Sequence, residues 1–130
     1  MSAITLHFKS TEFGCKDGTA YPEEWYPRLV TLCICLEQIR HELGGKPMTI
    51  ISGYRTVPYN KRCGGSKKSQ HLEGIAADIR VKGVEPQEVA DVIEGLIDDG
   101  RCLEGGIGVY HSQNFVHYDF RGDKARWQDG

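Results

Sequence analysis

Apolar residues between positions 29 and 43 recur at a nearly helical spacing, which only Arg40 interrupts. Pro27 stands where helices commonly begin, and Gly44-Gly45 marks the end of the pattern. A second helix is predicted over residues 85–99, where a Pro near the start and a Gly after the end give the same two signals. The pattern therefore predicts two helices, each with an apolar side to bury.

Short runs rich in β-branched residues or with alternating polarity predict four strands. These are Met48–Ser52, Ala76–Val81, Ile107–Tyr110 and Phe115–Phe120. A turn at residues 112–114 joins the last two as a hairpin, while residues 11–27 and 53–70 are rich in turn signals and predict loops. We therefore expect a single α+β domain over residues 1–130, with two helices packed on one face of a small antiparallel sheet.

Composition narrows the classes of function. The 130 residues carry 39% hydrophobic and 26% charged side chains and a formal net charge of −2, so nothing favours nucleic acid as a partner. No apolar run approaches the ~20 residues that a membrane-spanning helix needs, and the first eight residues lack the pattern of a signal peptide. We expect a monomer without membrane insertion that is synthesised in the cytoplasm.

Two predicted strands each carry polar residues on one face. Because side chains alternate along a strand, His117 and Asp119 share a face, and Asp78 lies opposite the apolar side of residues 76–81. If the two strands are neighbours, Asp78 and His117 converge, and the loop before residue 76 brings in His71. We therefore expect the loop over residues 53–70, which leads into His71, to form one wall of a site.

Two imidazoles and a carboxylate are ligands that suit Zn²⁺, and three protein ligands leave a fourth position open. An open position is typical of catalytic zinc sites. Taken singly, His71, Asp78 and His117 would be ordinary surface residues, but nothing structural requires all three on one polar face. The sequence thus predicts one zinc ion per chain in a hydrolase. His111, at the hairpin turn, is a weaker candidate for a residue behind the ligands.

Several motifs match a known family. They resemble the zinc D-alanyl-D-alanine carboxypeptidases, which share their fold with vancomycin-resistance D,D-dipeptidases, several phage endolysins and the hedgehog signalling domain. The likeness spans about residues 8–127. The matching segments are Ser52-Gly53-Tyr54-Arg55-Thr56, Tyr59-Asn60, Gly64-Gly65, the Ser-x-His-x-x-Gly-x-Ala-x-Asp run at 69–78, Gly105-Gly106-Ile107-Gly108 and Phe115-Val116-His117-Tyr118-Asp119-Phe120-Arg121.

The resemblance implies roles for residues around the predicted site. It implies that His71, Asp78 and His117 bind zinc, the same three residues that the strand pattern brings together. It implies that Arg55 stabilises the oxyanion formed when a peptide carbonyl is attacked. Ser69 matches a position that helps hold the terminal carboxylate of the substrate, and Tyr54 is expected to contact the substrate as well.

One position departs from the family pattern. The dipeptidase and endolysin branches carry a general-base Glu three residues before the last zinc histidine, where this chain has Asn114. The branch that the chain most resembles tends to carry an Asp two residues after that histidine, as at Asp119. Two roles stay open for Asp119: the general base, or an acceptor that orients the imidazole of a zinc ligand.

The sequence therefore predicts a zinc peptidase that hydrolyses amide bonds in peptidoglycan stem peptides, at a D-Ala or at a cross-link. A phage or prophage lysis enzyme that acts on the cell wall would suit this prediction. One alternative is a zinc-binding module that does not catalyse, as in hedgehog-type domains, which Asn114 favours. Another alternative is a cytosolic dipeptidase that acts on D-Ala-D-Ala.

Overall fold

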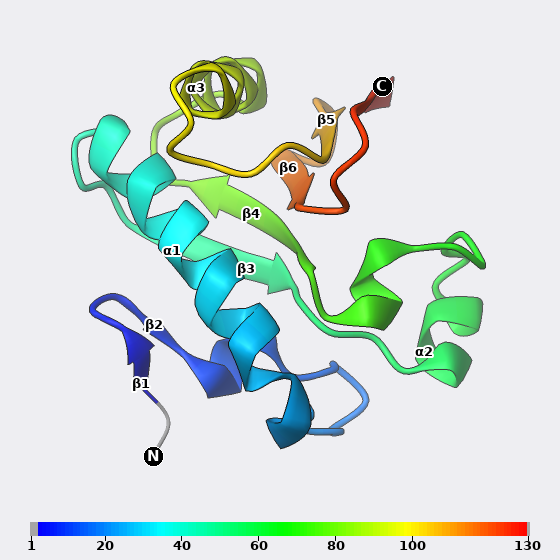
Figure 1. The fold of residues 1–130 in the computed structure, drawn as a ribbon. Coiled ribbons are helices and arrows are strands. Elements are labelled where there is room, and N and C mark those ends of the chain that lie inside the picture. The colour runs from blue at the N-terminus through cyan, green and yellow to red at the C-terminus, as the bar shows by residue number, and fades with distance from the viewer. Residues whose placement is uncertain (1–2, 130) are drawn as a thin grey trace.

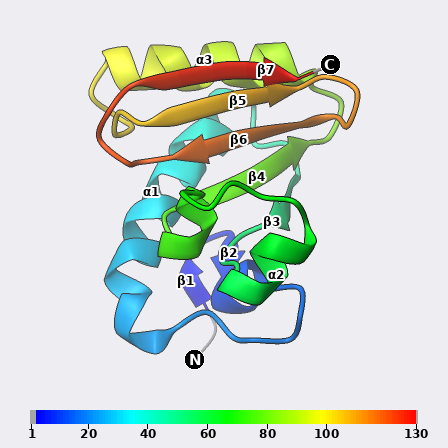
Figure 2. The same ribbon diagram turned by 90° about the vertical axis from the view of Figure 1, so that its right-hand side faces the viewer.

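The computed structural model describes residues 3–129 and combines one main sheet with helices on both of its sides (Figures 1 and 2). Short 3₁₀ helices are labelled η. In chain order the elements are β1 (Ala3–Thr5), β2 (Phe8–Lys9), η1 (Ser10–Phe13), η2 (Glu23–Trp25), α1 (Tyr26–Glu42), β3 (Met48–Ser52), α2 (Val57–Arg62), η3 (Gln70–Glu73), β4 (Ala76–Val81), α3 (Pro86–Asp98), β5 (Gly106–Tyr110), β6 (Phe115–Asp119) and β7 (Ala125–Asp129).

The main sheet has five strands in the order β3-β4-β6-β5-β7, and it is mixed. The prediction of an antiparallel sheet is wrong at one edge, because β7 pairs with β5 in parallel. The chain reverses after β6, so β7 runs antiparallel to β6 and lies on the far side of β5. Residues 125–129 have no alternating apolar pattern, which is why the sequence did not predict this strand.

The two predicted helices, α1 and α3, lie on the same side of the sheet, as expected (Figure 1). The opposite side carries α2 and η3 (Figure 2). The prediction of a loop over residues 53–70 is wrong where α2 forms. Thr56 caps this short helix by accepting a hydrogen bond from the backbone N–H of Tyr59 at 3.3 Å, and Pro58 fits the first turn.

Side-chain alternation in β4 and β6 divides the molecule into an apolar core and a polar face. The core-facing residues of these two strands are all at most 2% exposed: Ala77, Ile79, Val81, Val116 and Tyr118. Leucines and isoleucines of α1 and α3 complete this core. The other face of the same strands carries Asp78, His117 and Asp119, which are also buried. The fold thus encloses acidic and imidazole groups on the side away from α1 and α3.

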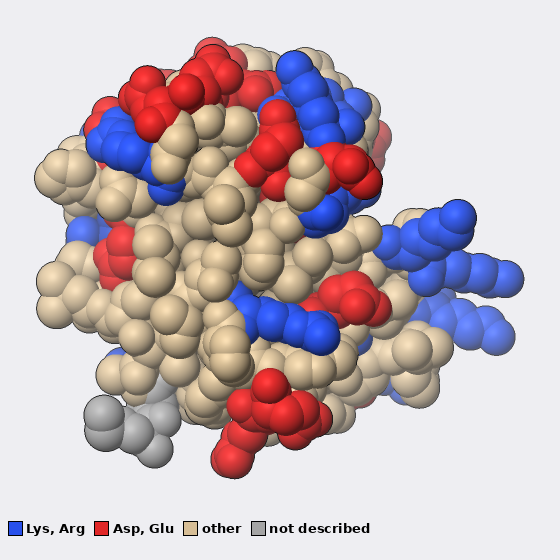
Figure 3. Space-filling view, in the orientation of Figure 1, with Lys and Arg blue, Asp and Glu red and all other residues tan. Residues whose placement is uncertain are grey.

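Charge is distributed unevenly over the surface. Lys and Arg side chains project from α2 and the loop that follows it, whereas acidic side chains gather around α3 (Figure 3). None of the helices within residues 3–129 combines the length and the apolar character needed to cross a membrane.

Candidate metal centre

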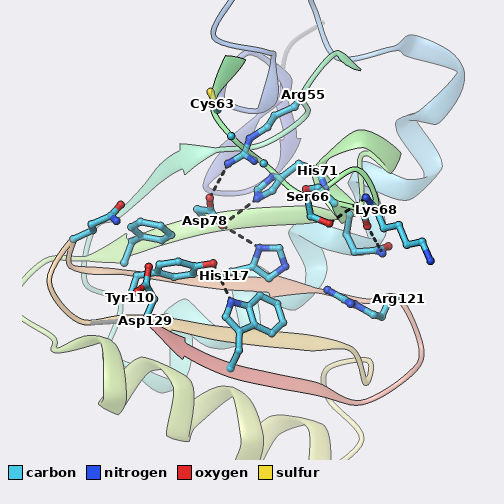
Figure 4. Close-up of a pocket in the computed structure, with 17 residues that line it drawn as sticks. Arg55, Cys63, Ser66, Lys68, His71, Asp78, Tyr110, His117, Arg121 and Asp129 are labelled. Atoms are coloured by element: carbon cyan, nitrogen blue, oxygen red, sulfur yellow. Dashed lines mark hydrogen bonds and ion pairs between the residues drawn. The ribbon is translucent and has the colours of Figure 1, made fainter. Parts of the chain in front are cut away.

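His71, Asp78 and His117 form the one cluster of potential metal ligands within residues 3–129. One ligand atom from each lies within 4.8 Å of the others, and all three residues are buried. His71 comes from η3, Asp78 from β4 and His117 from β6 (Figure 4). Because Asp78 and His117 are directly paired across the β4–β6 ladder, the strand register itself brings these two together. The predicted convergence of the three residues is confirmed.

Hydrogen bonds fix which ring nitrogen each histidine turns toward Asp78. Oδ1 of Asp78 lies 3.1 Å from Nε2 of His71 and 3.1 Å from Nδ1 of His117. The opposite nitrogen of His71 lies 2.6 Å from the carbonyl oxygen of Gly53, and that of His117 lies 2.6 Å from Asp119. Since a carbonyl and a carboxylate only accept, these outer nitrogens carry hydrogen. In the neutral rings, the lone pairs therefore face Asp78.

This arrangement fits a cation. The Asp78 oxygen faces a lone pair of each histidine at about 3 Å, and such lone pairs repel unless a proton or a metal ion lies between them. Without a metal, the site favours a proton on His117: burial lowers the pKa of His117, but its contacts with Asp119 and Asp78 outweigh burial and raise it. Burial likewise raises the pKa of Asp78, but hydrogen bonds with His117 and His71 hold it well below its usual range. Imidazole nitrogen and carboxylate oxygen together suit zinc.

The turn that presents His71 is held at both ends. The Ser69 hydroxyl caps η3 by accepting from the backbone N–H of His71 at 3.2 Å. Gly74 ends η3 with φ +70, and its carbonyl oxygen accepts from the Tyr21 hydroxyl at 2.7 Å. A Cβ at Gly74 would lie 2.8 Å from that hydroxyl oxygen, so only glycine fits both the left-handed backbone and the close approach.

Arg55 lies beside the cluster with a fixed guanidinium. Its Nε donates to Ser52 Oγ at 3.2 Å, its Nη1 to Asn60 Oδ1 at 3.2 Å and its Nη2 to Asp78 Oδ2 at 3.4 Å. The backbone N–H of Arg55 also donates to the carbonyl oxygen of His71 at 3.1 Å. Arg55 is thus paired with an acid, and that acid belongs to the candidate metal cluster.

A cavity of about 600 Å³ opens onto the cluster (Figure 4). Arg55 and Ser69 line it together with His71, Asp78 and His117. Tyr54 is not among its lining residues. Its ring packs edge-on against Tyr21 and Trp25, with centroids about 6 Å apart, because the aromatic cluster next to the core takes up this side chain.

Asn114 and His111 lie in the hairpin turn, and neither is among the residues that line the cavity. Asn114 has φ +56, a left-handed conformation that Asn tolerates better than most residues. Its carbonyl oxygen accepts a hydrogen bond from Arg80 at 2.8 Å. An Asn is thus well suited to this position of the turn. His111 is exposed and contacts Gln128 at 3.3 Å.

Asp119 lies behind His117, with no exposed surface. Its Oδ2 faces His117 Nε2 at 2.6 Å and Arg121 Nη2 at 2.7 Å. Its Oδ1 accepts from the backbone N–H groups of Gly106 and Arg121, both at 3.0 Å, and from Arg121 Nε at 2.9 Å. Burial raises the pKa of Asp119, but His117 and Arg121 outweigh it and hold the pKa well below its usual range. Five donors thus occupy the roughly four lone-pair sites of a carboxylate.

Sequence reasoning predicted the strands β5 and β6 but missed β7 and the aromatic wall that it forms with them beside His117. Trp127 lies with its ring centroid 5.0 Å from that of His117, and its Nε1 donates to the Tyr110 hydroxyl at 2.9 Å. Tyr110 in turn stacks on Phe115 at 4.4 Å. The third glycine of the Gly-Gly-Ile-Gly motif, Gly108, was the available signal, because a Cβ there would collide with the Trp127 ring.

Residues 2–119 match the Peptidase M15 family, and the chain belongs to this family of peptidases. Over 87 residues the chain is 32% identical to the peptidoglycan L,D-endopeptidase MepK of Escherichia coli K12, covering 63% of this chain and 44% of that protein. Over 44 residues it is 43% identical to the zinc D-Ala-D-Ala carboxypeptidase of Streptomyces albus G, covering 34% of this chain and 17% of that protein.

A probable peptidoglycan L,D-endopeptidase MepK of Haemophilus influenzae is 35% identical over 75 residues, covering 54% of this chain and 37% of that protein. The chain thus spans less than half the length of these curated relatives. The suspected kinship with zinc D-Ala-D-Ala carboxypeptidases is confirmed at the level of the family.

Proposed function

We propose that this protein is a zinc-dependent peptidase that hydrolyses amide bonds in peptidoglycan stem peptides or in their cross-links. The observation that carries the proposal is the buried His71–Asp78–His117 cluster, which faces an open cavity of about 600 Å³. A catalytic zinc site needs a few protein ligands and space for a substrate, and this geometry supplies both. The names of the E. coli and S. albus G relatives support peptidoglycan peptides as the substrate class.

One zinc ion per chain would be held by Nε2 of His71, Nδ1 of His117 and a carboxylate oxygen of Asp78. When bound, zinc supplies Lewis acidity, which polarises a carbonyl oxygen and activates water near neutral pH. Arg55 would place fixed donors near the oxygen on which negative charge develops, which commonly gives a large catalytic contribution. The Ser69 hydroxyl keeps its own proton for a substrate oxygen, since it accepts from the backbone of His71.

Asp119 acts in this proposal as a positioning residue. Its carboxylate oxygens already face five donors, which leaves no lone pair for the proton of an attacking water. By accepting from Nε2 of His117, it would keep Nδ1 of that ring directed at the metal. The general-base role remains the competing proposal for Asp119, and the Asp119→Asn variant discussed below separates the two.

A non-catalytic zinc module is the second candidate function. The position at which the dipeptidase and endolysin branches carry a general-base Glu is Asn114 in this chain, and Asn114 is not among the described residues that line the cavity. This favours a module without a base. A dipeptidase that acts on free D-Ala-D-Ala is a variant of the enzymatic proposal. We propose a monomer in each case.

The test is digestion of purified peptidoglycan with zinc-loaded protein, followed by mass spectrometry of the products. We expect new amine and carboxyl termini at a stem-peptide bond, loss of cleavage with a chelator and recovery with added zinc. Free D-Ala-D-Ala in a parallel assay distinguishes a dipeptidase. Stoichiometric zinc without cleavage of cross-linked, monomeric or dipeptide substrates would favour the non-catalytic module instead.

A further inference from the structure

The cavity differs in chemistry from one end to the other, and the strand register defines its direction. At one end, Tyr110 pairs with Phe115 on one neighbouring strand and with Asp129 on the other. In the middle, Gly108 lies between His117 and Trp127 in the same way. The chain leaves β6 at the opposite end, toward Arg121. Figure 4 accordingly draws Arg121 and Lys68 on one side of the metal cluster, with Tyr110 and Asp129 on the other.

Arg121 is a fixed cation at its end of the cavity. Its Nε and Nη2 form a fork with the carboxylate of Asp119, at 2.9 and 2.7 Å. Its guanidinium also lies 5.5 Å from the Trp127 ring, within the range of a cation–π contact. Such a fork costs little further side-chain entropy when a ligand binds, because the guanidinium is already ordered.

The sequence makes room for this ion pair. A Cβ at Gly106 would collide with the Asp119 carboxylate and lie 2.7 Å from Arg121 Nη2. A Cβ at Gly105 would collide with the Asp119 carbonyl oxygen and lie 2.9 Å from the backbone nitrogen of Arg121. The glycine pair at the start of β5 therefore leaves the space in which Asp119 and Arg121 lie beside the candidate metal ligands.

Only the cationic partner of this pair is accessible from the cavity. The Asp119 side chain is 0% exposed, whereas that of Arg121 is 28% exposed and lines the cavity. Nη1 of Arg121 makes no hydrogen bond to any residue from 3 to 129, while all three donor nitrogens of Arg55 are engaged. A ligand at this end thus meets unpaired N–H donors and a positive charge.

We propose that Arg121 binds a free carboxylate of the substrate and thereby determines which peptides the cavity accepts. This inference rests on the proposed function and names its substrate class: peptides with an ionised carboxylate close to the scissile amide. A guanidinium is well suited to a carboxylate because its donors match the two oxygens. The carboxylate has two possible sources, the C-terminus of a stem peptide or an internal acidic residue, and these correspond to carboxypeptidase and endopeptidase binding.

The test compares three peptides: a stem pentapeptide that ends in D-Ala-D-Ala, its C-terminal amide, and the form with its internal carboxylates amidated. Values of kcat/KM are measured with the zinc-loaded wild type and with Arg121→Gln. In the wild type, amidation of the bound carboxylate should lower kcat/KM about 10- to 100-fold, the range of a hydrogen bond to a charged group. In Arg121→Gln, acid and amide should differ by no more than about twofold. The amidation that lowers kcat/KM in the wild type identifies the source of the bound carboxylate.

Arg101→Gln is the matched control, because it removes the same charge at an exposed site that is not among the cavity-lining residues, and it should keep the wild-type ratio. Zinc content is measured in each variant. The ratio of kcat/KM for the acid peptide to that for the amide peptide is taken within one variant, so a general loss of activity cancels. If Arg121→Gln does not fold, Arg121→Lys replaces it, and a reduced ratio is expected because an ammonium cannot form the fork with Asp119.

If no peptide is hydrolysed, the proposed activity is wrong. The role of Arg121 is then tested by binding, with the Kd values of the same acid and amide peptides compared in the wild type and the variant. The inference is overturned if neither amidation affects the wild type. It is also overturned if the variant that folds discriminates acid from amide as strongly as the wild type does.

Discussion

The two faces of β4 and β6 share one backbone and are both buried, yet they are stabilised differently. The face toward α1 and α3 is almost wholly apolar and gains free energy by removing its surface from water. The cavity face buries Asp78, His117 and Asp119, which is costly unless each polar atom has a partner. Some of these partners come from other segments, as His71 does for Asp78, and others lie two residues away, as Asp119 does for His117 and Arg121 for Asp119. The apolar face thus accounts for the stability of the fold, whereas the polar face carries the proposed metal site.

The largest expected effect comes from removing a ligand from the polar face. His117→Ala should weaken zinc binding by about 10²- to 10³-fold, since about 10–16 kcal/mol is typical of structural zinc sites, or roughly 2.5–4 kcal/mol for each of four ligands. The fold should persist, because the apolar face is unchanged. Metal analysis and circular dichroism check this, with Gln113→Ala as a cavity-lining control that keeps its zinc. Stoichiometric zinc in His117→Ala would remove this residue from the site.

The converse change on the apolar face should affect stability and leave the metal in place. Ile79→Ala removes a side chain that is 1% exposed, one residue away from Asp78. The expected loss is about 2–5 kcal/mol in the free energy of unfolding, as for other buried Ile to Ala changes. Urea unfolding at a fixed zinc concentration measures it, because bound metal raises the apparent stability. Loss of zinc stoichiometry in the folded variant would contradict the division into two faces.

The alternation that separates these faces was readable from the sequence, and it explains what could be predicted. β4 lies at residues 76–81 as predicted, and the polar face of β6 follows from a period of two. α2 was missed because residues 57–62 lie among Gly, Pro and Asn, although Thr56 with Pro58 is a recognisable start signal. Short helices give too few turns for a periodic pattern.

β7 and Arg121 were missed for a different reason. The position of β7 depends on a contact between segments, because Trp127 packs over Gly108. Arg121 lies only two residues after Asp119, but the sequence pattern does not show that the two form an ion pair. The sequence contained the complementary signal, the Gly-Gly-Ile-Gly motif, but a glycine does not reveal which side chain occupies the space beside it. The role of Asn114 is similar, since its left-handed φ becomes evident only in the folded turn.

A third effect concerns catalysis on the polar face. Arg55→Lys should lower kcat by about 10²–10³ with little change in KM, as when one oxyanion donor is lost. A lysine cannot bind Ser52, Asn60 and Asp78 at once, so it would not place its charge in the same position. Steady-state kinetics on a muropeptide measures the two constants. An unchanged kcat would mean that Arg55 serves only to pair with Asp78.

The smallest expected effect distinguishes the two roles of Asp119. In Asp119→Asn, one carboxylate oxygen becomes an NH₂ group, which would face donors from His117 and Arg121 or from the backbone of Gly106. If Asp119 orients His117, zinc affinity and activity should both fall by roughly 10–100-fold. If Asp119 is the general base, hydrolysis should nearly vanish while zinc affinity stays the same, because an amide accepts no proton.

Zinc titration and muropeptide kinetics on the same preparation separate these outcomes. Asn114→Ala is the matched control and should be mild in either case, since Asn114 lies in the turn and carries no titratable proton. Proportional loss of zinc affinity and activity would mean that Asp119 orients His117 and is not the general base. Wild-type values for both measurements would mean that Asp119 is not the base and that a neutral acceptor at this position holds the His117 ring as well as a carboxylate does.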